Sequence, residues 1–291
     1  RRIMFTLLLL LFSAANIKAE IINVGGIMTE DQTWTSDNIY VVNQDFIITN
    51  NHILIIESGV EVRINFSRGI VVDNGSLVVN GSISDSVCFK SNHNIPGQTW
   101  KWKGIVIRNE NPENQNTIRY ASFSNADKAL TLENSKNVII ENCSFQLSQI
   151  IGVVINSSSN CLLNNCVIED NYDGIEIYAG ILGKSSNNII SNCLVKNHNQ
   201  NIFIYREEGG IISNNLIKKN IISSGINGIW VINSGSVVNS SNIIEHNIII
   251  NNGSEIGAGI YLSQDSTVVS NNVFWANNIA VYSDFGSDNC I

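Results

Sequence analysis

The chain has 291 residues, a formal net charge of −8 and a charged fraction of only 14%. Because its one basic cluster is the pair Lys218 and Lys219, the sequence offers no surface for tracking phosphates, and we expect no nucleic-acid partner. An apolar fraction of 44% is enough for a substantial core, and the two prolines leave long stretches free to form hydrogen-bonded ladders.

The first 19 residues have the features of a secretory signal peptide. Arg1 and Arg2 precede an apolar run of roughly ten residues, and the residues around Ala19 suit a cleavage site. This run is too short to cross a bilayer comfortably, and no later segment is apolar enough. We therefore expect an exported protein, extracellular or at the cell surface with the periplasm as an alternative, and no transmembrane segment. A buried N-terminal helix is the competing interpretation.

After this segment, the chain divides into a cap and a repetitive domain. We interpret residues 20–50 as an N-terminal cap and residues 51–291 as one domain, with irregular turns at 51–90 and a loop at 91–101. Similar heptapeptides then recur along the sequence: "IIENCSF" at 139–145, "LLNNCVI" at 162–168, "IISNCLV" at 189–195, "IISNNLI" at 211–217, "IIEHNII" at 243–249 and "VVSNNVF" at 268–274. Such self-similarity is the signature of a repeat architecture.

Each repeat contains three short apolar runs separated by polar turns, which favours strands over helices. In "GIEIY" at 174–178, Ile175 and Ile177 share one side of a strand, whereas Glu176 and Tyr178 share the other. A unit of three strands with polar corners is one rung of a parallel β-helix, and stacked rungs bury a common core. The sequence predicts about ten rungs. The regular ones begin at Gly104, Ala129, Gly152, Gly174, Asn201, Gly228, Gly259 and Asn278.

Asparagine is the unusual residue, with 45 copies. When the heptapeptides are aligned, two columns of polar or small residues appear. The first contains Asn142, Asn165, Asn192, Asn214, His246 and Asn271, and the second contains Cys143, Cys166, Cys193, Asn215, Asn247 and Asn272. Asparagine tolerates the left-handed backbone that a tight corner needs, and stacked amides can also hydrogen-bond along a column. Six cysteines in an exported chain suggest disulfides, but three share one column and are better interpreted as buried fillers.

This pattern resembles the right-handed parallel β-helix repeat proteins of the pectin-lyase-like superfamily, over roughly residues 30–291. The segment "TWTSDNIYVVNQDFIITNNHILIIESGVEVRIN" at 33–65 resembles the entry region of secreted bacterial members, and "TWKWKGIVI" at 99–107 resembles the entry into their regular coils. The resemblance implies an all-β, right-handed parallel β-helix solenoid with three strands per rung. It implies little about activity, because one such fold supports many functions.

The sequence ends in the middle of a rung. "SDNCI" at 287–291 matches "SSNCL" at 158–162, where a strand begins. An unfinished rung exposes strand edges, which proteins normally cover. We therefore expect that the natural chain continues with further C-terminal residues or domains.

An aromatic stripe is the candidate binding surface. From residue 178 onward, every rung places an aromatic residue at an outward position of its first strand, and we call this set the aromatic stripe: Tyr178, Phe203, Tyr205, Trp230, Tyr261 and Tyr282. Aromatic faces flanked by Asn and Ser suit sugar rings, and a polysaccharide is the predicted partner. In the β-helix enzymes that the chain resembles, the same sheet forms the polysaccharide groove. Two alternatives are burial of the stripe under insertions at 179–186, 206–210 and 220–227, and simple strand propensity.

The evidence for catalysis is weaker. Resembling enzymes use an Asp-rich calcium site with an Arg base, or clustered carboxylates with a His. Here the densest ionisable group near the stripe is Glu176, Arg206 and Glu207, and we favour its interpretation as a surface salt-bridge cluster. His198 could act as a base, but nothing in the sequence orients it. No metal or cofactor motif is present, and calcium is left open.

Three functions are consistent with these features. The first is a non-catalytic exported surface or extracellular β-helix protein that binds carbohydrate along the stripe. The second is a polysaccharide lyase or glycoside hydrolase acting on an extracellular polysaccharide, and the third is an architectural spacer of a larger adhesin. An enzyme requires ionisable groups that converge beside the stripe, whereas a spacer requires a stripe that is covered.

Overall fold

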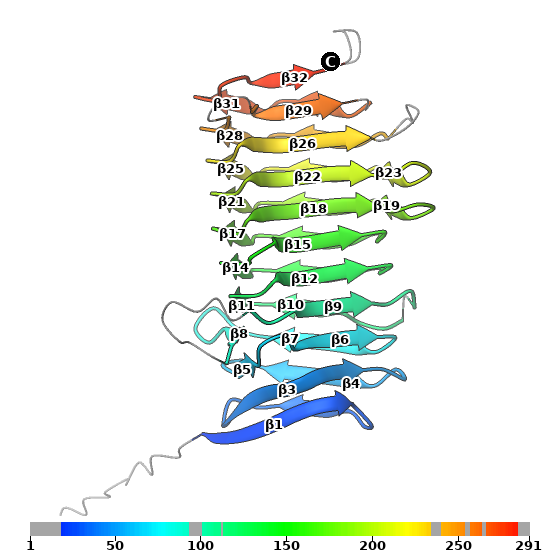
Figure 1. Cartoon of the computed structure of the whole chain (residues 1–291), viewed down its shortest axis with the longest axis vertical. Coiled ribbons are helices and arrows are strands. Elements are labelled where there is room, and N and C mark those ends of the chain that lie inside the picture. Colours follow the sequence, from blue (N-terminus) through cyan, green and yellow to red (C-terminus); the bar gives the residue numbers. More distant parts are fainter. Residues whose placement is uncertain are drawn as a thin grey trace, which may run out of the picture.

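The computed structural model describes residues 19–92, 101–111, 113–233, 240–253, 257–263 and 266–284. In these ranges the chain forms strands, turns and bends, with no α-helix. Figure 1 shows the strands stacked in parallel layers along one long axis. The predicted all-β, right-handed parallel β-helix is confirmed. The predicted signal peptide, apart from Ala19, lies outside the described residues.

Three parallel faces surround the core, and each complete rung contributes one strand to each face. The first face contains β1 (Glu20–Ile27), β3 (Asn38–Ile48), β6 (Gly69–Asp73), β9 (Gly104–Arg108), β12 (Lys128–Glu133), β15 (Ile151–Asn156), β18 (Asp173–Ala179), β22 (Gln200–Arg206), β26 (Asn227–Asn233), β29 (Ile260–Ser263) and β32 (Val281–Ser283).

The second face has 10 strands: β2 (Gln32–Trp34), β4 (Ile53–Glu57), β7 (Ser76–Asn80), β10 (Thr117–Arg119), β13 (Ile139–Glu141), β16 (Leu162–Asn164), β20 (Ile189–Ser191), β24 (Leu216–Lys218), β27 (Ile243–Glu245) and β30 (Val268–Ser270). The third face contains β5 (Glu61–Ile64), β8 (Val87–Ser91), β11 (Ala121–Ser124), β14 (Ser144–Gln146), β17 (Val167–Glu169), β21 (Leu194–Lys196), β25 (Ile221–Ser223), β28 (Ile248–Ile250) and β31 (Val273–Trp275). A small extra sheet joins β19 (Lys184–Ser186) to β23 (Ile211–Ser213).

The segment interpreted as a cap already pairs in parallel with the rungs above it. Strand β3 bends around a corner, because its first half pairs with β5 and its second half with β6. Strand β1 follows the same path below β3, with an irregularity between Val24 and Gly26 where the glycine has a φ of 77°. Parallel stacking therefore starts at Glu20.

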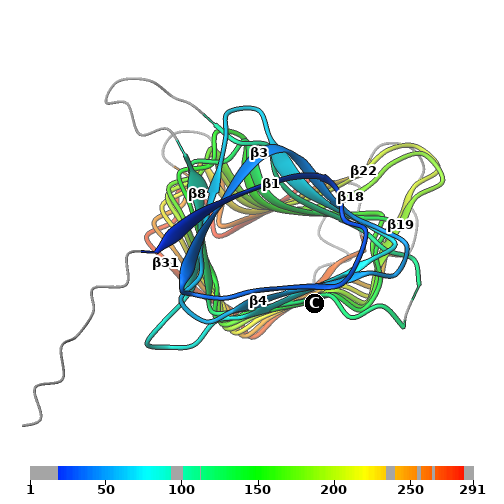
Figure 2. The ribbon, with the colours of Figure 1, turned by 90° about the horizontal axis from the view of Figure 1, so that it is seen from below.

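The core is a set of aliphatic columns, one inside each face. Along the first face, Val153, Ile175, Ile202, Ile229 and Ile260 are direct partners in successive rungs, and all are fully buried. The view along the axis in Figure 2 shows the same outline repeated from layer to layer. β-Branched residues fit the pleated surface of a strand, and each strand gains its apolar contacts from the rungs above and below.

Near the lower part of the stack, aromatic rings replace the aliphatic side chains on the inside of the third face. Phe89, Phe123 and Phe145 occupy one column, with ring centroids 4.9 and 4.7 Å apart in nearly parallel planes. The rung spacing of a parallel sheet sets this separation, so identical rings at one register position must stack.

The corners combine two kinds of residue, as the two asparagine columns predicted. Residues of the first column take a left-handed backbone, with φ of 58° at Asn142, 53° at Asn165 and 55° at Asn192. Residues of the second column are buried, including Cys143 and Cys166, except that Asn272 is half-buried. The first asparagine of each corner therefore turns the chain, and the following residue fills the space inside the corner.

The predicted register is wrong at one repeat. Strand β23 stacks on β19, and β24 stacks on β20, so "LIKKNII" at 216–222 is the true counterpart of "IISNCLV" at 189–195. The heptapeptide "IISNNLI" at 211–217 belongs to the preceding corner of its rung. Both corners have a left-handed residue followed by a buried one, and this shared pattern caused the misalignment.

The correction changes the membership of the asparagine ladders. Asn215 stacks between Asn188 and Asn242, whereas Asn220 continues the column of Cys193 and leads to Asn247 and Asn272. In each ladder, one side-chain oxygen accepts the backbone N–H and the amide N–H of the residue below, at distances of 2.9–3.0 Å. The stack thereby pairs amides that would be costly to bury alone.

The cysteines of the described chain are free thiols. The hydrogen bond with Cys143 and burial raise the pKa of the Cys166 thiol far above its ordinary value, although the contact with Cys193 opposes this effect. Burial raises the pKa of Cys161 to about 11. Such thiols stay protonated and unreactive at neutral pH. This agrees with their predicted role as core fillers.

Candidate functional site

The aromatic stripe lies on the outer surface of the first face, over β18, β22, β26, β29 and β32. Phe203, Trp230, Tyr261 and Tyr282 are direct partners in successive rungs and form one column. Tyr178 and Tyr205 form a second column two residues further along their strands. The alternation of strand residues directs these side chains outward while the isoleucines between them enter the core.

The six rings of the stripe form one continuous series of contacts. The distances between ring centroids are 5.7 Å for Tyr178 and Tyr205, 5.7 Å for Tyr205 and Phe203, 5.1 Å for Phe203 and Trp230, 5.9 Å for Trp230 and Tyr261, and 4.9 Å for Tyr261 and Tyr282. Aromatic pairs at such separations contribute about 0.5–1.5 kcal/mol each beyond their burial. The stripe is therefore a preorganised surface, with each ring held by its neighbours.

The stripe is partly open to solvent. Its first five rings are half-buried, and the Tyr282 side chain is exposed. The indole Nε1 of Trp230 is buried and has no hydrogen-bond partner among the described residues. Leaving such a donor unpaired costs about 1–3 kcal/mol, so folding alone gives no reason for a tryptophan at this position.

Two of the insertions that could have covered the stripe point away from it. Figure 2 shows the turns between β18 and β19 and between β22 and β23 projecting outward at the corner between the first and second faces. The tip of the first turn is solvent-exposed, at 72% for Ile181 and 87% for Leu182. The predicted insertion at 220–227 is wrong, because residues 221–223 form the regular strand β25.

Glu176 lies at the lower end of the stripe. It is the register partner of Phe203 in the rung above and of Val154 in the rung below. Burial raises the pKa of the Glu176 carboxyl, an effect that the positive charge of Lys128 opposes and the negative charge of Asp173 strengthens. In the described chain, no hydrogen bond or ion pair is found for this carboxylate. It is a half-buried acid without a close partner.

Neither of the other two catalytic candidates forms a hydrogen bond or ion pair with Glu176 in the described ranges. Arg206 is almost fully buried and donates from Nη1 to the backbone oxygen of Gly210 at 3.3 Å. Strand alternation turns it inward, because it follows the outward Tyr205. Glu207 accepts the backbone N–H of Ile181 at 3.2 Å, and its hydrogen bond with the Tyr178 hydroxyl raises the pKa of Tyr178 to about 12. Arg206 is thus turned away from the outer surface, whereas the charges of Glu207 and Glu176 both act on Tyr178.

His198 is a structural residue rather than an exposed base. Its ring is buried, with Nδ1 3.2 Å from the backbone nitrogen and 3.0 Å from the backbone oxygen of Asn171, and Nε2 3.1 Å from the backbone oxygen of Ile168. Burial lowers the pKa of this imidazole, although these backbone contacts partly oppose the effect. A neutral ring that accepts at Nδ1 and donates at Nε2 satisfies both partners.

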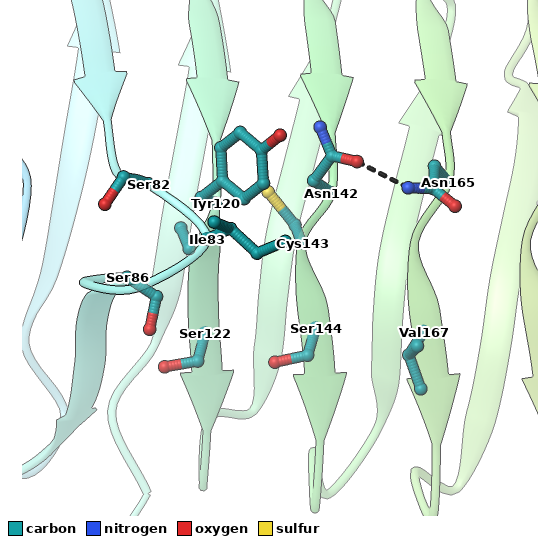
Figure 3. Close-up of a pocket in the computed structure, with 11 residues that line it drawn as sticks. Ser82, Ile83, Ser86, Tyr120, Ser122, Asn142, Cys143, Ser144, Asn165 and Val167 are labelled. Carbon is teal, nitrogen blue, oxygen red and sulfur yellow. Dashed lines mark hydrogen bonds between the residues drawn. The ribbon is translucent and has the colours of Figure 1, made fainter.

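A pocket on the opposite side of the stack was not anticipated from the sequence. It has a volume of about 510 Å³ and forms where the turn carrying Ser82 and Ile83 crosses the outer corner of the next rungs (Figure 3). Its other lining residues include Tyr120, Ser122, Ser144 and Val167, and Asn165 donates to Asn142 along its rim. The lining has hydroxyls, amides and a thiol but no carboxylate, so it offers no acid–base pair.

Neither a metal site nor a membrane-spanning helix is found in the described ranges. No group of three or more His, Cys, Asp or Glu side chains is placed there to hold a metal ion. The same ranges contain no helix with the length and apolarity needed to span a bilayer.

The repeat architecture identifies the family. The family model described as the right handed beta helix region matches residues 29–237 and 128–291, which together span most of the chain. The chain belongs to this family. No curated protein matches the sequence.

Solved structures with the same fold are similar at low sequence identity. The periplasmic alginate epimerase AlgG has a TM-score of 0.51 and 13% identity, over 92% of this chain and 66% of the epimerase chain. A mutant of that epimerase has a TM-score of 0.53, with the same identity and coverage. The ORF18 protein of Geobacillus virus E2 has a TM-score of 0.50 and 14% identity, over 83% of this chain and 56% of its own. The chain thus spans less than two thirds of either protein, and these likenesses show the fold alone.

Proposed function

We propose that this chain is an exported, non-catalytic β-helix protein that binds a polysaccharide along the aromatic stripe, at the cell surface or outside the cell. The observation that carries the proposal is the unbroken contact series from Tyr178 to Tyr282 on an outer sheet surface. A linear stripe matches a linear polymer, because successive sugar rings can stack on successive aromatic rings. The similarity to an alginate epimerase is consistent with a polysaccharide ligand.

The alternative of a lyase or hydrolase has less support. Hydrolysis of a glycosidic bond by the common mechanism needs two carboxyl groups about 5–9.5 Å apart across the bond. The neighbouring carboxylate that raises the pKa of Glu176, Asp173, accepts the backbone N–H of Gln200 at 2.9 Å, and Arg206 is buried under its own loop. Among the described residues, the stripe therefore offers no free acid and base that converge on one bond. The spacer alternative has less support as well, because the two described insertions leave the stripe uncovered.

A glycan array followed by calorimetry tests the proposal. The wild-type protein should bind one or more polysaccharides, and Trp230→Ala should weaken that binding at least tenfold, which is about 1.4 kcal/mol. The matched control is Trp275→Ala, because Trp275 is 72% exposed on the third face and outside the stripe. Both variants should keep the far-ultraviolet circular dichroism of the wild type.

Three outcomes would count against this function. Equal loss of binding in both tryptophan variants would place the ligand elsewhere or indicate general destabilisation. A wild-type protein that binds no glycan would favour the spacer. Release of shortened or unsaturated oligosaccharides from a bound polymer, abolished by Glu176→Gln, would favour the enzyme.

A further inference from the structure

The charged side chains next to the aromatic stripe are acidic. Glu176 is the neighbour of Phe203 in the rung below, and Glu207 is hydrogen-bonded to the Tyr178 hydroxyl. At the upper end, the Tyr261 hydroxyl donates to both carboxylate oxygens of Asp284, at 3.2 and 3.0 Å. Carboxylates therefore flank the stripe at both ends.

The basic side chains of the rungs that carry the stripe lie away from its outer surface. The described residues from β18 to β32 include five Lys or Arg residues: Lys184, Lys196, Arg206, Lys218 and Lys219. Lys196 lies on the third face, where it forms an ion pair with Glu169 at 2.9 Å, and Lys218 and Lys219 belong to the second face and its corner. Arg206 is buried beneath its loop, and Lys184 lies in the strand beyond the outward turn. None of the five projects from the outer surface of the stripe.

The lower end of the stripe has the composition of a binding site for an ammonium group. The partly buried Glu176 lies beside the rings of Tyr178 and Phe203, and Tyr205 completes the next rung. A cation over an aromatic face is stabilised by about 0.5–2 kcal/mol, depending on how far it is desolvated. The same cation would offset the unfavourable burial of the Glu176 carboxylate.

We propose that the aromatic stripe selects polysaccharides carrying free amino groups, and that Glu176 with Phe203 and Tyr178 forms the ammonium subsite. This inference rests on the proposed function of the stripe. A polyuronate, which carries one carboxylate per sugar, would meet Glu176, Glu207 and Asp284, and the cation that acts on Glu176, Lys128, lies two rungs below it, outside the stripe. Like-charge contacts of this kind exclude a ligand even where its rings could stack. The ligand would then differ in charge from alginate, despite the shared fold.

Three hexasaccharides of matched length test the inference: one of glucosamine, one of N-acetylglucosamine and one of mannuronate. Calorimetry at a pH where the amines are protonated should give at least tenfold tighter binding for the glucosamine hexamer than for its N-acetylated counterpart. No binding is expected for the mannuronate hexamer. Added salt should reduce the difference between the first two ligands, because it screens partly exposed charges.

Substitutions separate charge selection from stacking. Glu176→Gln should reduce the preference for glucosamine about tenfold and leave affinity for the N-acetylated hexamer unchanged, because the wild-type carboxylate makes no contact that the fold requires. Trp230→Ala should weaken binding of both hexamers. The matched control is Glu169→Gln on the third face, which should alter neither affinity.

The outcomes distinguish the two proposals. If a hexamer binds through Trp230 but glucosamine is not preferred, or if mannuronate binds as tightly, charge selection is overturned and the stripe remains a glycan site. If none of the three binds, or if Trp230→Ala changes nothing, both proposals are overturned. An unchanged preference in Glu176→Gln would remove Glu176 from the subsite.

Discussion

Single residues determine how the chain turns and what lies inside each turn. Asn142, Asn165 and Asn192 have φ values near 55°, which most side chains tolerate poorly. At the equivalent corner of the next rungs, Lys219 and His246 take the same geometry. The corner therefore requires a left-handed backbone conformation rather than an asparagine side chain. Asparagine adopts this conformation at a lower free-energy cost than most other residues that carry a side chain.

His198 shows the reverse case, in which the side chain itself is required. It occupies a buried corner and supplies one acceptor to Asn171 and one donor to Ile168. A protonated imidazole would carry two donors, which the backbone oxygens of Asn171 and Ile168 can accept, but it would also bury a positive charge. Burial lowers the pKa of this imidazole, and the contacts with Asn171 and Ile168 only partly oppose the effect.

We expect His198 to make stability depend on pH. Because the pKa is lower in the folded than in the unfolded state, stability should be fully present above the ordinary imidazole pKa of about 6.5 and decrease as pH falls below it. His198→Asn should remove this decrease, since an amide also supplies an acceptor and a donor. The measurement is the denaturation midpoint as a function of pH.

The control for this prediction is His246→Asn, which alters a solvent-exposed corner histidine. It should retain the acid-side loss of stability seen in the wild type. Identical pH profiles for the wild type and His198→Asn would show that other groups cause the loss.

At the scale of the element, each corner behaves as a column rather than as an isolated turn. The amide of Asn215 accepts from Asn188 and donates to Asn242 and to the backbone oxygen of Ser185. Buried amides are therefore fully paired only when the rungs above and below are in place. The corner ladders fix the register of neighbouring rungs in the same way that the isoleucine columns fill the core.

Asn215→Ala should be strongly destabilising, by about 3 kcal/mol, because it leaves buried donors of Asn188 and the oxygen of Ser185 without partners. The matched control is the preceding residue, Asn214, which is exposed and has a φ of 57°. Asn214→Gly should cost less than about 1 kcal/mol, since glycine adopts this backbone freely. Chemical denaturation measures both, and equal effects would contradict the division of roles.

At the scale of the molecule, the stack is nearly one-dimensional. Each rung contacts the rungs next to it, so stability is approximately a sum of rung and interface contributions. The stripe forms only when the rungs are stacked, because its six aromatic residues come from five strands separated along the sequence. Its ring contacts follow from the rung spacing and the parallel register.

Removal of one complete rung, residues 200–226, should leave a folded β-helix. The deletion places Asn227 after Asn199, so β26 would stack directly on β18 with inward and outward residues preserved. Circular dichroism should retain its β-sheet form, and glycan affinity should fall because Phe203 and Tyr205 are lost from the stripe.

Deletion of half a rung, residues 200–213, is the control. It would bring a second-face strand into the position of a first-face strand and should prevent cooperative folding. Similar stability of the two deletions would contradict the stacking of equivalent strands.

Much of this protein is determined by its sequence. The recurrence of Ile, Val and Asn predicts three strands per rung, the parallel stack, the buried cysteine column and the outward aromatic positions, because a strand alternates with a fixed period and equivalent positions must stack. Other features depended on the tertiary structure. The two corners of a rung share one pattern, so only strand pairing shows that "LIKKNII" rather than "IISNNLI" continues the repeat. The burial of Arg206 and the pocket beneath Ile83 depend on where turns project, and turn geometry is not periodic.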